Sequence, residues 1–169
     1  MITADRYHDI SVGHRVHGHE GKCQHLHGHN YRVHFKVAPI PIMPLIPETD
    51  AEKLDDVGRV LDFSVIKSKL CMWLEENWDH KFIAWEEDVF MAELYQLTTI
   101  AAYGSGWTAA MMMFVDSIVW VPFNPTAENM GLHLLNKIGP AVLEGTHCQL
   151  VEVVIEETRK CSVSVKLEA

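Results

Sequence analysis

The segment His27-Gly28-His29 stands directly before a run in which apolar and polar residues alternate, and this combination constrains the fold more than any other feature. Tyr31 to Val37 alternates with a period of two, which indicates a half-buried β-strand. Side chains two residues apart in a strand project to the same face. We therefore expect two imidazoles side by side at the end of a strand whose apolar side chains line a core.

A third histidine lies in an earlier stretch, Ile2 to Val16, which reads as an irregular strand. An antiparallel hairpin with a long tip at residues 17–24 would place His14 beside His27 and His29. Three neutral imidazoles with an open fourth position are how proteins hold a catalytic zinc ion. The sequence therefore predicts a Zn²⁺ site and suggests an enzyme.

Cys23 is separated from His27 by three residues and gives this site more than one interpretation. Beside an open zinc ion, a thiolate could remove a substrate proton. As a fourth ligand, Cys23 would instead close a structural site. The histidine-rich tip could also be exposed and without function. A binding-only cupin is disfavoured, because the glutamate usual four residues after the second histidine is Val33 here.

Composition limits the classes of protein that the chain can belong to. Its 169 residues, 48% of them hydrophobic, suit one domain with a substantial core. The net charge of -9 and the lack of a basic face argue against a nucleic-acid partner. Met1 to Ile10 lacks the apolar core of a secretory signal, so we expect a cytoplasmic protein. Its four unclustered cysteines would then be thiols or ligands.

Two stretches have the apolar periodicity of helices. The first begins near Ser64, with Asp62 or Ser64 as its cap, and ends near Trp78. The second begins within residues 124–128, which offer cap residues, a proline suited to a first turn and an early acid. Its apolar stripe continues to about Gly139.

Two further strands are predicted at residues 149–157 and 162–168, around a turn at residues 159–160. Proline offers no amide donor to a ladder, so a loop or sheet edge is expected around the prolines at positions 39, 41, 44 and 47. The predicted order is strand, strand, helix, helix, strand, strand.

The pattern between Trp85 and Val121 is less regular and contains an uncharged run, residues 94–115. Its length would allow a membrane span. However, Gly104-Ser105-Gly106 interrupts the run and no basic residues flank it. We expect an internal helix, a loop or a subunit contact here, and no membrane partner.

Acidic residues elsewhere offer further chemistry. In Asp79-His80 the carboxylate could hold the imidazole as a proton shuttle, although the pair could equally be a helix-end interaction with the dipole. Glu128 and Glu157 could each pair with the guanidine-like edge of a purine or pterin. Both could also be solvated acids.

Six motifs occur in the order found in the 6-pyruvoyltetrahydropterin synthase family, which the chain resembles over nearly its whole length. We interpret it as a single domain, residues 1–169, with an insertion at about residues 86–121. The matching motifs are Val12-Gly13-His14-Arg15, Cys23-x3-His27-Gly28-His29-Asn30-Tyr31, Leu61-Asp62-Phe63, Asp79-His80, Asn124-Pro125-Thr126-Ala127-Glu128-Asn129 and Glu157-Thr158.

The resemblance implies an α+β tunnelling fold, or T-fold. This fold has an antiparallel four-stranded sheet with two helices packed on one face. Family members assemble into barrels, commonly homohexamers, with active sites between subunits. One chain is therefore expected to lack a complete site.

The resemblance also implies roles for individual residues. Cys23 would abstract a proton, Asp79 and His80 would relay protons, and the carboxylates would anchor the pterin ring. The implied zinc ligands are His14, His27 and His29, the implied catalytic residues are Cys23, Asp79, His80 and Glu157, and the implied substrate-binding residues are Thr126, Glu128 and Glu157.

The spacing of three residues between Cys23 and His27 resembles the bacterial 6-carboxytetrahydropterin synthases of queuosine and 7-deazaguanine biosynthesis. Animal pyruvoyl synthases have five residues there, and a third branch replaces the cysteine with glutamate. The implied lyase reaction converts 7,8-dihydroneopterin triphosphate to 6-carboxy-5,6,7,8-tetrahydropterin, acetaldehyde and triphosphate. The alternatives are 6-pyruvoyltetrahydropterin synthase and a catalytically silent zinc-binding assembly protein.

Overall fold

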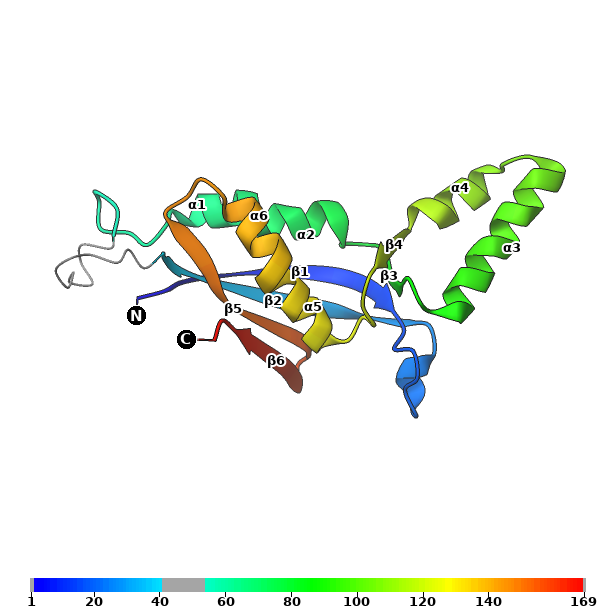
Figure 1. Ribbon diagram of the computed structural model, residues 1–169, viewed down its shortest axis with the longest axis horizontal. Coiled ribbons are helices and arrows are strands. Elements are labelled where there is room, and N and C mark those ends of the chain that lie inside the picture. Colours follow the sequence, from blue (N-terminus) through cyan, green and yellow to red (C-terminus); the bar gives the residue numbers. More distant parts are fainter. Residues whose placement is uncertain (1, 41–53, 169) are drawn as a thin grey trace.

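Strands β1 (Ala4–His14) and β2 (His27–Pro39) form the antiparallel hairpin that the alternation predicts (Figure 1). The structure is a computed structural model that describes residues 2–40 and 54–168. In the register, Ile10 pairs with Tyr31 and His14 pairs with His27. Because side chains alternate across a strand, the three histidines continue the same face as the buried apolar residues of the hairpin.

The two C-terminal strands are also where they were predicted. Strand β5 (Cys148–Thr158) pairs antiparallel with β2, and β6 (Cys161–Lys166) pairs antiparallel with β5. The turn between them falls at residues 159–160. Pro39 is the last residue of β2 and pairs with Cys148, while the prolines at positions 41, 44 and 47 lie outside the described residues.

The first predicted helix consists of α1 (Phe63–Ile66), a π-helical turn (Lys67–Cys71) and α2 (Met72–Asn77). The Asp62 carboxylate accepts a hydrogen bond from the N–H of Ser64. Of the two predicted cap residues, Asp62 and Ser64, the cap is therefore Asp62. The predicted end near Trp78 is confirmed.

The second predicted helix consists of α5 (Ala127–His133), a π-helical turn (Leu134–Ile138) and α6 (Gly139–Leu143). Thr126 caps it by accepting a hydrogen bond from the N–H of Asn129. The helix continues past Gly139, because the π turn widens the spacing just before the glycine and the following proline.

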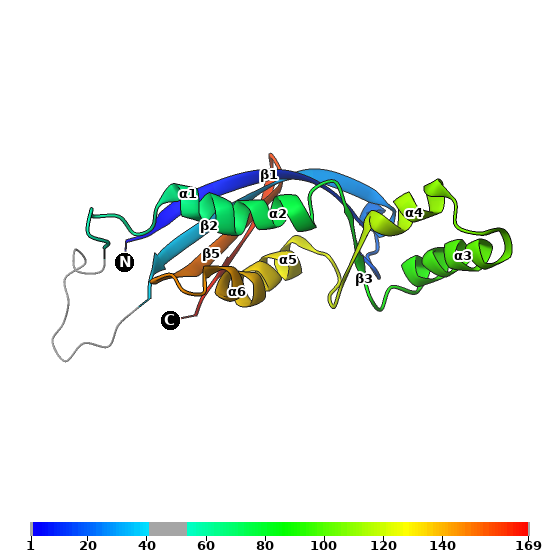
Figure 2. The same cartoon turned by 90° about the horizontal axis from the view of Figure 1, so that it is seen from above.

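Both helices pack on the same face of the sheet (Figure 2). Their apolar stripes meet the inward side chains of β1, β2 and β5 in one continuous core. The largest fully buried side chains of this core include Trp78, Tyr31, Phe35, Leu74 and Leu134. The core therefore fixes the face of the hairpin that carries the histidines.

The opposite face of the sheet is polar. Arg32 on β2 donates to Asp9 on β1 at 2.8 Å, and Lys36 donates to Glu152 on β5 at 2.9 Å. The hydrogen bond from Arg32 lowers the pKa of the Asp9 carboxyl. His34 lies on this face, 3.2 Å from a carboxylate oxygen of Glu156.

The predicted sheet of four antiparallel strands is wrong, because the described residues form six strands in the order β4-β3-β1-β2-β5-β6. Strand β3 (Phe82–Trp85) pairs parallel with the end of β1, and β4 (Ile118–Val121) pairs parallel with β3. At four residues each, both are too short to show a clear alternation. They use the free edge of β1, so the chain after Trp78 extends the sheet.

Two helices connect these added strands and project from one end of the molecule (Figures 1 and 2). They are α3 (Val89–Ser105) and α4 (Ala109–Asp116), separated by Gly106 with a φ of 80°. None of the described helices is long and apolar enough to span a membrane. The projecting pair nevertheless exposes large apolar side chains, including Phe90, Leu97, Ile100, Tyr103, Trp107 and Met113.

Gly28 provides a test of the hairpin, because a Cβ at this position would lie 2.7 Å from the backbone oxygen of Val12. We predict that Gly28→Ala lowers the free energy of unfolding by about 1–3 kcal/mol, since overpacking forces a backbone shift. Urea denaturation measures this change.

Gly104→Ala is the matched control. This glycine is in helix α3, and a Cβ there would meet nothing within 4 Å. Alanine should leave stability unchanged or raise it by up to about 1 kcal/mol. Equal losses in the two variants would contradict the close approach at Gly28.

Candidate metal centre and adjoining cavities

Three imidazoles converge at the end of the β1–β2 hairpin. One nitrogen each of His14, His27 and His29 lies within 4.8 Å of the others. His14 is buried, with 1% of its surface exposed, and the other two are half-buried. Within the described part of the chain, this cluster contains the three predicted histidines and not Cys23. The arrangement favours a site of three imidazoles over a closed site with a thiolate.

Backbone carbonyls fix the orientation of two of the imidazoles. His14 Nδ1 lies 2.7 Å from the carbonyl oxygen of Pro125, and His27 Nδ1 lies 2.8 Å from that of His25. A carbonyl only accepts, so each Nδ1 donates and each Nε2 keeps its lone pair. Such bonds orient imidazoles toward metal ions in many proteins.

The Nε2 atom of His27 is buried and has no hydrogen-bond partner among the described residues. Buried polar atoms are rarely left unpaired, and a bound ion can supply the missing partner. Burial lowers the pKa of His14, against the opposing effect of its bond to Pro125, and so favours the neutral, ligating form. The residues present therefore fit a divalent metal ion with a preference for nitrogen ligands.

Tyr31 and Glu157 complete the inner wall of the cluster. The Tyr31 hydroxyl donates to Glu157 Oε1 at 3.1 Å and lies 3.1 Å from His14 Nε2. The same carboxylate oxygen is 3.6 Å from His29 Nε2 and 3.8 Å from His14 Nε2. Burial, followed by the charge of Glu157, raises the pKa of Tyr31, so the hydroxyl stays protonated as a donor.

Beside the cluster is a cavity of about 430 Å³. Cys23 lines it from the hairpin tip, Thr126 and Glu128 line it from the start of α5, and Glu157 lines it from the end of β5. The Cys23 thiol is partly exposed. The cavity also touches His14, so a molecule bound there meets one imidazole of the cluster, the thiol and both carboxylates together.

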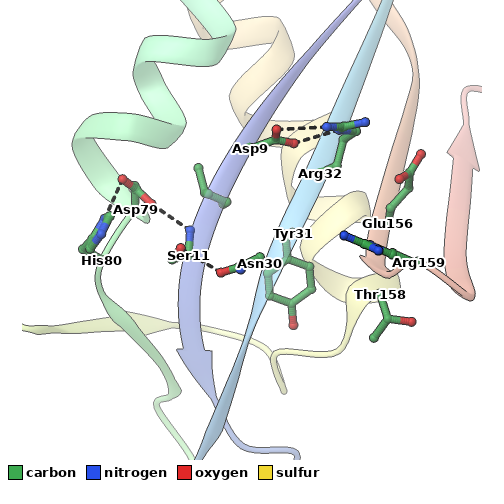
Figure 3. A pocket seen from close by; sticks show the side chains of 11 residues that line it. Asp9, Ser11, Asn30, Tyr31, Arg32, Asp79, His80, Glu156, Thr158 and Arg159 are labelled. Carbon is green, nitrogen blue, oxygen red and sulfur yellow. Dashed lines mark hydrogen bonds and ion pairs between the residues drawn. The ribbon is translucent and has the colours of Figure 1, made fainter.

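Asp79 and His80 lie elsewhere, at the edge of a second cavity of about 480 Å³ on the polar face of the sheet (Figure 3). His80 Nδ1 donates to Asp79 at 2.7 Å, so the two side chains do form a pair. Burial raises the pKa of Asp79, but hydrogen bonds from the N–H of Ser11 and from His80 outweigh it, and the pKa is lowered overall.

The structure therefore brings together most of the predicted site residues, but not all of them. His14, Cys23 and the substrate-binding candidates line one cavity, whereas His27 and His29 line a separate cavity together with His80. The pair Asp79–His80 also lines the cavity on the polar face, with Arg159 and Thr158 across from it (Figure 3). A single chain does not present His80 to the cavity of Cys23. That one chain lacks a complete site stays a prediction.

Sequence reasoning assigned no role to Tyr31 or to the carbonyl of Pro125. The alternation places Tyr31 among the apolar strand residues and the family motif includes it, and its position two residues after His29 also puts it on the histidine face. The bond between His14 and Pro125 joins residues 111 positions apart, and no local pattern indicates it.

The model of the family described as 6-pyruvoyl tetrahydropterin synthase matches residues 3–168. The chain belongs to this family. The expected resemblance is confirmed, and it places the chain in a family of enzymes. Among curated relatives in this family, a 6-carboxy-5,6,7,8-tetrahydropterin synthase from Rickettsia felis is 32% identical over 98% of this chain and 100% of the relative. A protein of the same name from Haemophilus influenzae is 26% identical over 82% of each chain.

Solved structures share the fold of this family member. An uncharacterized protein from Wolinella succinogenes has a TM-score of 0.79 at 22% identity, covering 99% of this chain and 98% of the other. The 6-pyruvoyl tetrahydropterin synthase of Caenorhabditis elegans has a TM-score of 0.58 at 23% identity, covering 99% and 96%. The expected α+β T-fold is therefore confirmed, apart from the number and direction of its strands.

We predict that replacing His14, His27 or His29 with alanine removes bound zinc from the purified protein. Loss of one of three ligands leaves a site that cannot hold a tetrahedral ion. Zinc per chain is measured by inductively coupled plasma mass spectrometry after dialysis.

His34→Ala serves as the control, because His34 is on the same strand but on the opposite face. It should keep the zinc content of the unmodified chain. Full zinc in His27→Ala would show that the imidazole cluster is not the metal site.

Proposed function

We propose that this protein is a zinc-dependent 6-carboxy-5,6,7,8-tetrahydropterin synthase. Its substrate would be 7,8-dihydroneopterin triphosphate, and its products would be 6-carboxy-5,6,7,8-tetrahydropterin, acetaldehyde and triphosphate. The observation that carries the proposal is the cavity in which His14, one member of the cluster of three imidazoles, meets a thiol and two carboxylates. Relatives of that name over the full chain support the choice of reaction.

His14, His27 and His29 would hold the zinc ion. Zinc bound by three imidazoles with an open position supplies Lewis-acid polarisation of substrate oxygens. The carbonyls behind His14 and His27 keep both Nε2 atoms directed into the cluster. Tyr31 would hold the Glu157 carboxylate in place through its hydroxyl hydrogen.

Recognition of the pterin ring is proposed for Glu128, Thr126 and Glu157. A carboxylate that faces two adjacent N–H groups of a guanidine-like edge accepts both, which fixes the plane of the ring. Cys23, on the hairpin tip of the same cavity, would take a proton from the substrate side chain.

His80 and Asp79 would complete the site from a neighbouring copy of the chain. The His80 imidazole is exposed at the polar face, with 80% of its surface accessible, while the Asp79 side chain is 14% exposed. Large exposed apolar side chains on α3 and α4 support association of this chain with other copies. We propose a homo-oligomer, with a hexamer favoured by the family resemblance, whose sites lie between subunits.

The cell location and pathway are part of the same proposal. A cytoplasmic enzyme that makes a carboxypterin would serve queuosine and 7-deazaguanine biosynthesis. The segment of residues 86–121 we interpret as an insertion within the single domain.

The identity of the products tests this function. We expect the zinc-loaded protein, incubated with 7,8-dihydroneopterin triphosphate, to release acetaldehyde and triphosphate and to form the carboxypterin, as measured by liquid chromatography and mass spectrometry. A pyruvoyl product would instead identify a 6-pyruvoyltetrahydropterin synthase. No turnover despite bound zinc would identify a silent assembly protein.

Cys23→Ala is the informative variant in this assay. It should keep its zinc and lose turnover by about 10²–10⁴-fold, the usual contribution of a positioned base. Cys148→Ala removes a buried thiol that is outside the cavity and should keep the wild-type turnover per folded molecule. Loss of zinc in Cys23→Ala would show that the thiol is a ligand.

Mixed oligomers test whether the site is shared between chains. Cys23→Ala and His80→Ala are each expected to be inactive. Co-expressed in equal amounts, they should recover about a quarter of wild-type activity, because half of the chains offer Cys23 and half of their neighbours offer His80.

The control mixture pairs Cys23→Ala with Glu157→Gln, two residues that line the same cavity of one chain. Both groups must come from the same chain to form a site, and every chain in this mixture lacks one of them. Activity should therefore not return. An inactive mixture of Cys23→Ala and His80→Ala, with mixed assembly verified by native mass spectrometry, would contradict a shared site.

A further inference from the structure

A buried ion pair joins the projecting segment to the loop that carries Cys23. Arg15, which follows the metal-site residue His14, donates through Nη1 to both carboxylate oxygens of Asp88, at 2.5 Å for Oδ2. Only 1% of the Asp88 side chain and 13% of the Arg15 side chain is exposed. Desolvation costs much of the attraction in such a pair, so we attribute its role to the geometry that it fixes.

The other donor of Arg15 reaches the loop of Cys23. Arg15 Nε donates to the carbonyl oxygen of Gln24 at 2.8 Å, directly after the cysteine. The N–H of the next residue, Val16, donates to the carbonyl oxygen of Cys23 at 2.8 Å. The backbone on both sides of the Cys23–Gln24 peptide is therefore tied to residues 15 and 16.

Asp88 is itself held rigidly. Its N–H donates to the carbonyl oxygen of Trp85 at 3.0 Å, at the end of β3, and its carboxylate accepts from the N–H of Phe90 at 3.1 Å as the cap of α3. The Arg15 guanidinium lies 4.8 Å from the centre of the Phe90 ring. The carboxylate thus has a fixed position relative to the sheet. Because Arg15 binds both this carboxylate and the carbonyl of Gln24, it also fixes the position of the loop that carries Cys23.

We propose that Asp88 is a positioning residue for Cys23 and acts through Arg15. This inference rests on the function proposed above for Cys23. In this assignment, the segment after β3 is part of the catalytic apparatus, although it contributes no side chain to the cavity of Cys23. The planar guanidinium is required because one group must serve Asp88 and Gln24 in two directions.

Two variants separate positioning from simple stability. Asp88→Asn keeps a capping oxygen for α3 but removes the charge that orients Arg15. Arg15→Lys can keep the ion pair, yet its single ammonium cannot also reach the Gln24 carbonyl in the same fork geometry. Both should loosen the peptide at Cys23 while the fold is retained.

Asp62→Asn is the matched control. Asp62 is also a helix cap bound to an arginine, since it accepts from the N–H of Ser64 at 2.8 Å and from Arg59 at 2.5 Å. It belongs to α1, which lies apart from both cavities. Any effect that it shares with Asp88→Asn is therefore an effect of helix capping.

The main measurement is the rate at which iodoacetamide alkylates Cys23 of the zinc-loaded protein, divided by the rate for N-acetylcysteine in the same reaction. Peptide mass spectrometry distinguishes Cys23 from Cys161, which lines the same cavity. We expect the ratio to rise about threefold or more in Asp88→Asn and Arg15→Lys, because the freed loop admits the reagent more easily. Asp62→Asn should leave the ratio unchanged.

Kinetics supply the second measurement. In Asp88→Asn, kcat should fall about 100-fold with KM and zinc content little changed, since a displacement of about 1 Å costs that much at a reacting group. Three results would overturn the proposal. They are an unchanged alkylation ratio in Asp88→Asn, wild-type behaviour of Arg15→Lys, and loss of zinc together with activity in Asp88→Asn. Absence of turnover in the wild-type protein would overturn the proposed function alone, because the alkylation ratio does not depend on substrate.

Discussion

The antiparallel register of β1 and β2 is the constraint on which the rest of the structure depends. It pairs His14 with His27, and the period of two then places His29 and Tyr31 on the same face as the hydrophobic core. A slip by one residue would turn the imidazoles to the polar face of the sheet. The same burial that stabilises the hairpin therefore assembles the three imidazoles of the candidate metal site, and Gly28 allows the close approach of the two strands there.

Much of this arrangement could be predicted, because it depends on local patterns. Alternation identified β2, β5 and β6, and cap residues identified the start of both helices that cover the sheet. The convergence of His14, His27 and His29 followed from their spacing along one hairpin. These features are all set by residues that are near one another in sequence or by a strong period.

The remaining features depend on contacts between distant residues. Strand β3 is four residues long and pairs parallel with β1, so it has neither a clear alternation nor a hairpin turn to indicate it. Arg15 and Asp88 are 73 positions apart, and an arginine beside a ligand has many possible partners. The contact between Tyr31 and Glu157 spans 126 positions. Sequence identified these residue types, but only the fold shows which of them meet.

The turn at His80 links the Asp79–His80 pair to the added strands. His80 has a φ of 56°, the one positive value outside glycine among the described residues, and its N–H donates to the carbonyl oxygen of Ser11 on β1. This turn presents the imidazole at the surface and also directs the chain into β3 along the edge of β1. A change in the length of this turn would therefore alter two features together: the position of the His80 imidazole and the point at which the chain joins the edge of β1.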